Sequence, residues 1–299
     1  MFGKITVRCK PLSPAVVAMA YRNACMAELQ AIKPGNVHVF ADGHGMTVHD
    51  FIKSADATAE LISQAGLTVG ERILQAVKAT QSAVGMNTNL GLILLCAPLI
   101  HAALSPATEL DLAQNLARVL EELSVEDGAR AAQAIVLAKP AGLGSATKHD
   151  VQAEIEVNLK QLMATAADRD LIAWQYANNY DTIFCDALPR FLTAKQVWQD
   201  QAKVNSGIWA ATAVYLDFLA RHPDSHIVRK HGIDIAQAVC LEAQAIEADY
   251  AKTDNPKLMQ APLLDWDASL KRRGINPGTS ADLTVATLLA YQLQQLGTA

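Results

Sequence analysis

The polar stretch from Lys33 to Phe51, KPGNVHVFADGHGMTVHDF, most constrains this chain, because it interrupts sequence that otherwise has a helical pattern. Its proline and glycines keep most of it from forming helix. Long irregular connections in compact domains are usually functional or disordered. Apolar residues are interleaved throughout this one, which favours a packed loop. We therefore predict that the stretch carries function.

The apolar composition predicts helices. Half of the 299 residues are apolar but only 5% are aromatic, so the apolar mass is Ala, Leu, Ile and Val. Such a mixture suits closely packed helices better than sheets. The sequence contains no series of regularly spaced strands and no convincing βαβ unit. We predict an all-α protein, a single multi-helix, bundle-like domain over residues 1–299 with active-site loops between helices.

Charge and cysteine content limit the partners and the compartment. A formal charge of −5 without a long basic run gives no general attraction to nucleic acid. Five scattered cysteines without a CxxC pair argue for a reducing compartment. There is no signal-peptide core, and the most apolar segment, 91–104, is too short to span a bilayer. We expect a cytoplasmic protein that binds small molecules and binds neither membranes nor nucleic acid. Whether it forms a homodimer is left open.

Capping residues and apolar periodicity predict the individual helices. The expected ranges are 13–32, 47–62, 68–84, a helix opened by 86–91, 110–123, 125–138, about 149–166, 170–179, 182–192, 194–220 with a break near 206–207, 232–250, and 279 or 280 to about 296. Two prolines, Pro256 and Pro262, predict an irregular stretch before the last helix.

Four loop-to-helix junctions hold the polar side chains that could do chemistry: 33–50, 86–91, 222–232 and 274–283. Free N–H groups at a helix N-terminus favour an anion, which fits 86–91 and the glycine-rich 274–283. Simple helix capping would explain both about as well. The stretch 222–232 combines a carboxylate, imidazoles and cations, a set that suits a phosphorylated ligand, although a solvated helix end can look the same.

Two His-Asp doublets, His49-Asp50 and His149-Asp150, suggest an alternative function as a helical metal-phosphohydrolase. That alternative needs an upstream histidine and a distant aspartate. His38 or His44 could supply the first, and Asp181 or Asp224 the second. The doublets alone are weak, because adjacent residues on a helix do not face the same way.

Taken in order, the four junctions resemble the triphosphoribosyl-dephospho-CoA synthase family. The resemblance spans most of the chain, with weak matching between about 100 and 220. It is carried by Glu28, Lys33-Pro34-Gly35, Gly43-His44, Met46, Phe51, Ser54, Asn87-Thr88, Gly91, Asp224-Ser225-His226, Arg229, Gly232, Gly274, Pro277-Gly278 and Ser280-Ala281-Asp282-Leu283. It implies an all-helical transferase that joins the ribose C1 of ATP to a hydroxyl of dephospho-CoA and expels adenine.

That implied chemistry assigns roles to the junction residues. Positive charge at the ribose C1 is stabilised by a nearby carboxylate, and the attacking hydroxyl needs a base, for which His44 or Glu28 is the first choice. A triphosphate needs Mg²⁺ held by carboxylates, here Asp224 and Asp282. The catalytic candidates are Glu28, His44 and Asp50, and the substrate- or nucleotide-binding candidates are Lys33, Gly35, Asn87, Thr88, His226, Arg229, Gly278 and Ser280, with Lys33 and Arg229 as phosphate cations.

The chain also departs from the family pattern. Family members commonly have His-Lys where this chain has Asn89-Leu90, and Gly45 replaces an aspartate for which Asp42 or Asp50 could substitute. Two other family motifs contain Gly-Gly, and at these places the chain has His231-Gly232 and Gly278-Thr279. A divergent branch with this Asn-Thr-Asn-Leu-Gly turn resembles proteins associated with one-carbon coenzyme biosynthesis. A methanopterin or methanofuran intermediate is therefore a second acceptor, with ATP or phosphoribosyl pyrophosphate as donor, and a non-catalytic nucleotide- or coenzyme-binding protein is a third possibility.

Overall fold

The computed structural model describes residues 11–105, 110–140, 155–199 and 205–298, and these contain fourteen α-helices and no strand. The all-α prediction is confirmed. In chain order the elements are α1 (Pro14–Gln30), α2 (Val48–Ile62), α3 (Val69–Val84), α4 (Leu90–Leu104), α5 (Leu112–Glu121), α6 (Val125–Ala138), α7 (Leu159–Ala164), α8 (Leu171–Ala177), the π-helical turn η1 (Thr182–Ala187), α9 (Leu188–Gln199), α10 (Ser206–Arg221), α11 (Ser225–His231), α12 (Ile233–Lys252), the 3₁₀ turn η2 (Pro256–Met259), α13 (Gln260–Arg272) and α14 (Gly278–Gly297).

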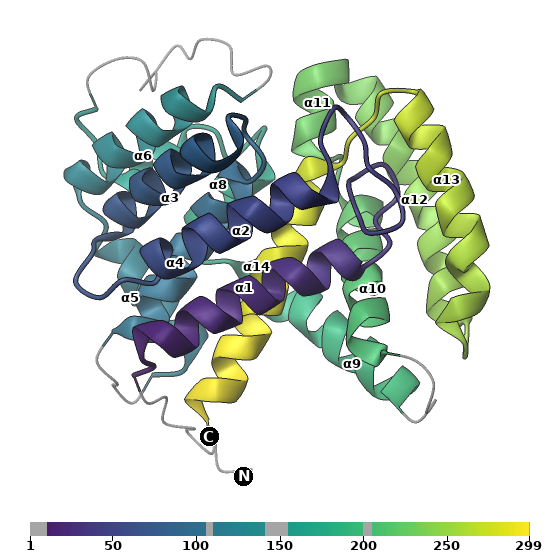
Figure 1. The fold of residues 1–299 in the computed structure, drawn as a ribbon, viewed down its shortest axis with the longest axis horizontal. Coiled ribbons are helices and arrows are strands. Elements are labelled where there is room, and N and C mark those ends of the chain that lie inside the picture. The colour runs from purple at the N-terminus through teal and green to yellow at the C-terminus, as the bar shows by residue number, and fades with distance from the viewer. Residues whose placement is uncertain (1–10, 106–109, 141–154, 200–204, 299) are drawn as a thin grey trace.

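The last helix, α14, runs through the middle of the molecule (Figure 1). It packs against α1, α4 and α10, so it joins the helices α2–α8 on one side to α9–α13 on the other. Its apolar and hydroxyl side chains are buried along most of its length. Buried apolar residues from α1 to α14 form one hydrophobic cluster.

Capping boxes fix several of the predicted helix starts. Thr47 caps α2 together with Asp50, Thr68 caps α3 with Glu71, and Ser124 caps α6, in each case by reciprocal side-chain and backbone hydrogen bonds. Each pair satisfies two of the backbone N–H groups that a helix start leaves without a partner. The predicted starts of these three helices are confirmed.

Two predictions about the C-terminal third are wrong. The stretch after Pro256 is not irregular but holds α13, because Pro262 lies in the first turn, where no intrahelical N–H is needed. The 222–232 junction contains a further short helix, α11, which Asp224 caps. Helix α10 begins at Ser206, where a break in the 194–220 helix was predicted, but α9 runs without a break from Leu188 to Gln199 across the predicted boundary between 182–192 and 194–220. Part of the predicted 149–166 helix lies outside the described residues.

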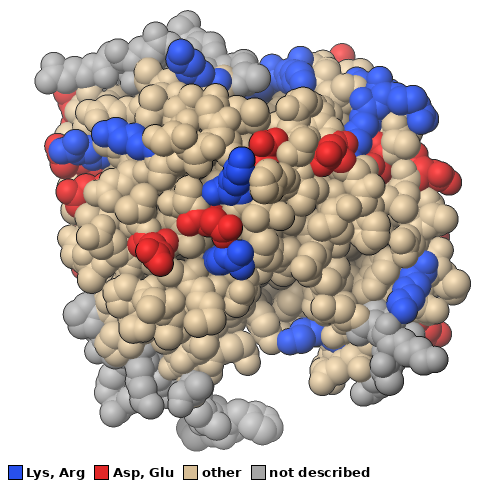
Figure 2. Space-filling view, viewed as in Figure 1, with Lys and Arg blue, Asp and Glu red and all other residues tan. Residues whose placement is uncertain are grey.

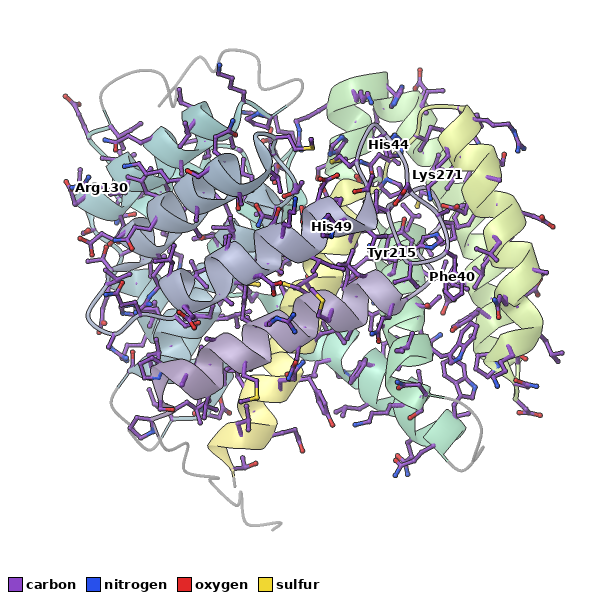
Figure 3. All side chains as sticks on the ribbon, in the orientation of Figure 1. Phe40, His44, His49, Arg130, Tyr215 and Lys271 are labelled. Atoms are coloured by element: carbon purple, nitrogen blue, oxygen red, sulfur yellow. The ribbon has the colours of Figure 1, made fainter. Side chains whose placement is uncertain are left out.

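The loop between α1 and α2 is a folded element fastened by long-range hydrogen bonds. The Gly35 N–H donates to Asp267 Oδ1 of α13 at 2.8 Å, and the Tyr215 hydroxyl of α10 donates to the Pro34 carbonyl at 2.6 Å. Asn36 Nδ2 donates to Asn276 Oδ1 at 2.7 Å. Figure 3 shows Tyr215 and Lys271 close to this loop from two different helices. The predicted packed loop is therefore what the chain forms.

Gly35 is the position in this loop where glycine is required. Its φ is +85°, and a Cβ would lie 2.8 Å from Pro277 Cδ and 3.1 Å from the Ile275 carbonyl oxygen. Both the left-handed backbone and the contact with 275–277 exclude a larger side chain. The two junctions 33–50 and 274–283 are thus packed directly against each other.

Gly35→Ala is expected to lower the free energy of unfolding by about 2–4 kcal/mol, since strain and steric overlap add. Chemical denaturation measures the change. Gly45→Ala is the matched control, because Gly45 has a φ of +75° and no described atom lies within 4 Å of a Cβ built there. Equal losses in the two variants would mean that the contact with Pro277 contributes nothing.

Candidate active site

A cavity of about 620 Å³ brings the four predicted junctions together. Its wall includes the end of α1 and the loop that follows, the start of α4, helix α11, and the start of α14. A fifth wall, which the sequence did not predict, comes from the end of α6 and from α7, α8 and the turn between them. Among the predicted site residues, the lining includes Glu28, His44, Asn87, Thr88, His226, Arg229, Gly278 and Asp282.

A buried ion pair closes the α1 side of the cavity. Lys33 Nζ donates to Glu28 Oε1, to Asn36 Oδ1 at 2.9 Å and to the Val37 carbonyl at 2.8 Å. All three ammonium hydrogens are therefore used within the protein, and Lys33 is only 1% exposed. Lys33 does not line the cavity, so its predicted role as a phosphate cation does not fit, and it instead holds the Glu28 carboxylate in place.

Asp282 presents a carboxylate that no described side chain satisfies. It lies in the first turns of α14 and lines the cavity, and no described group donates a hydrogen bond to it. Burial, followed by the charges of Glu28 and Asp224, holds the pKa of Asp282 well above its usual range. A carboxylate kept close to another carboxylate without a donor is well suited to a cation or a developing positive charge.

Gly91 makes room for that carboxylate. A Cβ at Gly91, the second residue of α4, would overlap Asp282 Oδ2 and lie 2.6 Å from Ile172 Cδ1. The Gly91 position in the 86–91 junction is therefore explained by packing against α14 and α8. The N-terminal ends of α4 and α14 were both predicted to bind an anion. They pack against each other at this point.

His44 reaches the cavity from the loop. Its Nε2 lies 2.7 Å from the Gly35 carbonyl oxygen, which can only accept, so Nε2 carries the hydrogen and Nδ1 keeps a lone pair. Burial lowers the pKa of His44, with a smaller lowering from Lys230 and Lys271. Figure 3 places His44 and Lys271 together at the loop, with His49 apart on α2. His44 is therefore neutral near pH 7 and can take a proton.

Asp224 holds α11 against α14. Its Oδ1 accepts from the N–H groups of His226 and Ile227, and its Oδ2 accepts from the Ser280 N–H at 2.7 Å and the Ser280 hydroxyl at 2.8 Å. With four donors on its carboxylate and 1% exposure, Asp224 does not fit the predicted role of a metal ligand. Ser280 is used by the same contact and does not line the cavity.

The positive charge of the cavity comes from several walls. Arg229 and Lys230 of α11 line it, and Arg229 Nη1 pairs with Asp170, which also caps α8. Lys139, at the end of α6, and Arg169, which precedes Asp170, also line the cavity. Sequence analysis missed Lys139 and Arg169, because single cations between helices carry no local pattern.

The remaining predicted residues have local structural roles. The Asn87 side chain accepts from the Leu90 N–H at 3.1 Å, and the Thr88 hydroxyl lies 2.6 Å from that of Ser54. Gly278 allows the His226 ring to approach, since a Cβ there would lie 2.9 Å from His226 Nδ1. Asp50 accepts from Thr47 and does not line the cavity, so the structure gives it a capping role rather than the predicted catalytic one.

The phosphohydrolase alternative gains no support from the described part of the chain. Within it, no group of three or more His, Cys, Asp or Glu side chains is arranged to hold a metal ion. His149-Asp150 lies outside the described residues. His49 is exposed on α2, while the Asp50 carboxylate accepts from the Thr47 backbone and hydroxyl.

The outer surface carries charges of both signs. Figure 2 shows basic and acidic side chains interspersed over one face, with most of that face uncharged. Searched over the described residues, the chain has no helix that is both long and apolar enough to cross a membrane.

The fold is all-helical, and the match to a family model identifies the protein as a transferase. The chain belongs to the ATP:dephospho-CoA triphosphoribosyl transferase family, whose model matches residues 14–299. The suspected resemblance is thereby confirmed. Its fold is similar to that of a crystal structure from Archaeoglobus fulgidus assigned as a triphosphoribosyl-dephospho-CoA synthase, with a TM-score of 0.60 and 22% identity, covering 84% of this chain and 100% of that one. No curated protein sequence matches.

Gly91→Ala is expected to displace the Asp282 carboxylate and reduce turnover about 10–100-fold, because small misplacements at a reacting centre are costly. Steady-state kinetics and thermal unfolding measure both effects. Gly207→Ala is the control, since Gly207 is also the second residue of its helix and, among the described residues, a Cβ there meets only Asn205 Oδ1 at 3.5 Å. Full activity in Gly91→Ala would contradict the tight fit.

Asp282→Asn is expected to stabilise the fold while weakening function, because it removes a buried carboxylate that repels Glu28. Melting temperature should rise by roughly 2–4 °C, about 1 kcal/mol for a chain of this size. Titration calorimetry should show ATP binding roughly tenfold weaker with Mg²⁺ present and unchanged without it. A lower melting temperature, or unchanged binding with Mg²⁺, would remove Asp282 from the assigned role.

Proposed function

We propose that the protein transfers the triphosphoribosyl group of ATP to a hydroxyl group of dephospho-CoA and releases adenine. The observation that carries this proposal is that carboxylates, a neutral imidazole and several cations line one cavity. Glu28, Asp282 and His44 come from α1, α14 and the loop, while the cations come from α6, α11 and the turn before α8. A ribosyl centre and a triphosphate need both kinds of group at the same time.

The proposed reaction uses the carboxylates and the imidazole in distinct ways. The acceptor hydroxyl attacks the ribose C1, its proton passes to His44 Nδ1, and a C–O bond forms as the C–N bond to adenine breaks. Adenine leaves with that electron pair and takes up a proton. Glu28 and Asp282 stabilise the positive charge that develops at C1. A positioned base of suitable pKa contributes about 10²–10⁴-fold to such a step.

Phosphate groups are proposed to bind at the cationic walls. Arg229 and Lys230 are near His226, whose pKa burial lowers to about 4, so that a neutral imidazole can donate a hydrogen bond without adding charge. Lys139 and Arg169 stand in for the cation that family members commonly have after Asn-Thr. Since all these side chains belong to one chain, the proposal needs no second copy.

Magnesium remains part of the proposal. Mg²⁺ is usually held by one or two carboxylates together with substrate phosphates and water. The Asp282 carboxylate, which lacks a donor among the described residues, and the adjacent Glu28 fit that requirement, while the fully bonded Asp224 does not. When bound with ATP, the ion would neutralise charge on the triphosphate.

Incubation with ATP, Mg²⁺ and dephospho-CoA is expected to release adenine, which chromatography detects, only when the acceptor is present. His44→Asn should lower the rate about 100-fold because the proton acceptor is lost. His49→Asn is the matched control, since His49 is exposed on α2 and does not line the cavity.

The other outcomes separate the alternatives. Adenine release without acceptor would indicate that water, rather than the acceptor hydroxyl, cleaves the bond between adenine and ribose in ATP. Adenine release with one-carbon coenzyme intermediates but not with dephospho-CoA would favour the second acceptor class. Tight ATP binding without adenine release under any condition would contradict the transferase proposal and favour a binding protein.

A further inference from the structure

Beneath the loop lies a buried carboxylate that the proposed reaction does not use. Asp267 of α13 is 2% exposed and does not line the cavity. Its carboxylate accepts from the Gly35 N–H at 2.8 Å and from Lys271 Nζ at 3.0 Å, and its Oδ1 lies 3.4 Å from His38 Nε2. Three groups of the loop and of α13 therefore converge on one side chain.

The Gly35 residue connects this carboxylate to the cavity. Its N–H points to Asp267 and its carbonyl oxygen accepts from His44 Nε2 at 2.7 Å. The φ of +85° at Gly35 directs the two groups of one residue to these two partners. His44 itself has a φ of 57°, which is uncommon for a residue with a side chain. The imidazole is thus held by backbone geometry that Asp267 fixes.

The surrounding charges agree with a fixed anion at this position. Burial alone would raise the pKa of Asp267, but His38, Lys271 and the Gly35 N–H lower it, so the carboxylate is charged. The His38 Nδ1 accepts from the Phe40 N–H at 3.3 Å, so the His38 hydrogen is on Nε2, which lies 3.4 Å from Asp267 Oδ1 without forming a hydrogen bond. Lys271 also donates to the Ala41 carbonyl at 3.0 Å. Removal of the anion would leave the Gly35 N–H without its acceptor and Lys271 with one acceptor fewer.

We propose that Asp267 is a positioning residue that orients His44 as the base, acting through the backbone of Gly35. This inference rests on the proposed function, and it adds a residue from a helix that the family resemblance did not include. The logic is that of a catalytic histidine whose ring and tautomer are set by the hydrogen bond on its second nitrogen. Here the bonding partner is a carbonyl oxygen, and the carboxylate holds that carbonyl's residue.

The first test needs no variant. Nitrogen-15 NMR of the histidine side chains in the full-length protein reports which ring nitrogen carries the hydrogen. At neutral pH, the wild-type His44 should be in the Nε2–H form. An Nδ1–H form, or rapid averaging of the two, would overturn the proposal.

The second test compares variants of two aspartates on α13. Asp267→Ala should lower kcat about 10–100-fold with a KM for ATP within about threefold of wild type, and the His44 signal should become averaged. Asp265→Ala removes the same charge from an exposed position and should leave both unchanged. Asp267→Asn keeps one oxygen for the Gly35 N–H and should recover most of the lost kcat.

Each remaining outcome decides the matter. If Asp267→Ala only lowers the melting temperature, with kcat and the His44 signal of wild type, then Asp267 is an anchor of the fold and the proposal is wrong. If Asp267→Ala does not fold, Asp267→Leu decides, because it keeps the side-chain volume but has no acceptor for the Gly35 N–H. Loss of the Nε2–H form with near-normal KM in Asp267→Leu supports the proposal, and wild-type kcat with an unchanged signal overturns it. If the wild type releases no adenine, the proposed function fails, and the His44 signal in wild type and variants alone judges this inference.

Discussion

The ion pair between Lys33 and Glu28 is the interaction on which the site depends. Placing two charges in a protein interior costs several kcal/mol per ion unless each is paired and hydrogen-bonded. Lys33 satisfies that condition by donating to Glu28, Asn36 and the Val37 carbonyl at once. The loop after α1 can therefore bury Lys33 only by curling back onto the end of α1. This requirement gives a glycine-rich segment a defined path.

That path determines what the rest of the chain must supply. The loop needs acceptors and packing partners, and α10, α13 and the 274–278 turn provide them through Tyr215, Asp267 and Asn276. Helix α14 then carries Asp282 across the centre of the molecule to the same cavity. Because residues from both ends of the chain meet there, the site and the hydrophobic core cannot be separated into independent parts.

The cavity combines features that do not favour stability. Burial raises the pKa of two carboxylates, Glu28 and Asp282, and the charge of Glu28 raises that of Asp282 further. Such arrangements are common where a protein must stabilise charge that appears only during reaction. The tight contact of Gly91 with Asp282 fixes one of these carboxylates without giving it a donor. The unfavourable arrangement is thus built into the packing of α4 on α14.

The sequence predicted the local features of this structure better than the long-range ones. Capping pairs such as Thr47 with Asp50 act within one turn, so they leave a pattern in the sequence, and the four junctions were found because they interrupt helical periodicity. Helix α13 was missed because Pro262 suggests a break unless its place in the first turn is known. The contact of Asp267 with Gly35 spans 232 positions and leaves no local signal. Asp224 was predicted to bind Mg²⁺ and Lys33 to bind phosphate, because helix capping, ion pairing and ligand binding use the same residue types.

The most direct test of this account is a crystal structure of the protein with ATP and Mg²⁺ in the absence of acceptor. The account predicts that the ribose C1 lies beside Glu28 and Asp282, with His44 Nδ1 facing the side from which the acceptor attacks, and that the triphosphate contacts the cations of α11. A nucleotide bound outside the cavity, or bound with its ribose away from the two carboxylates, would contradict it.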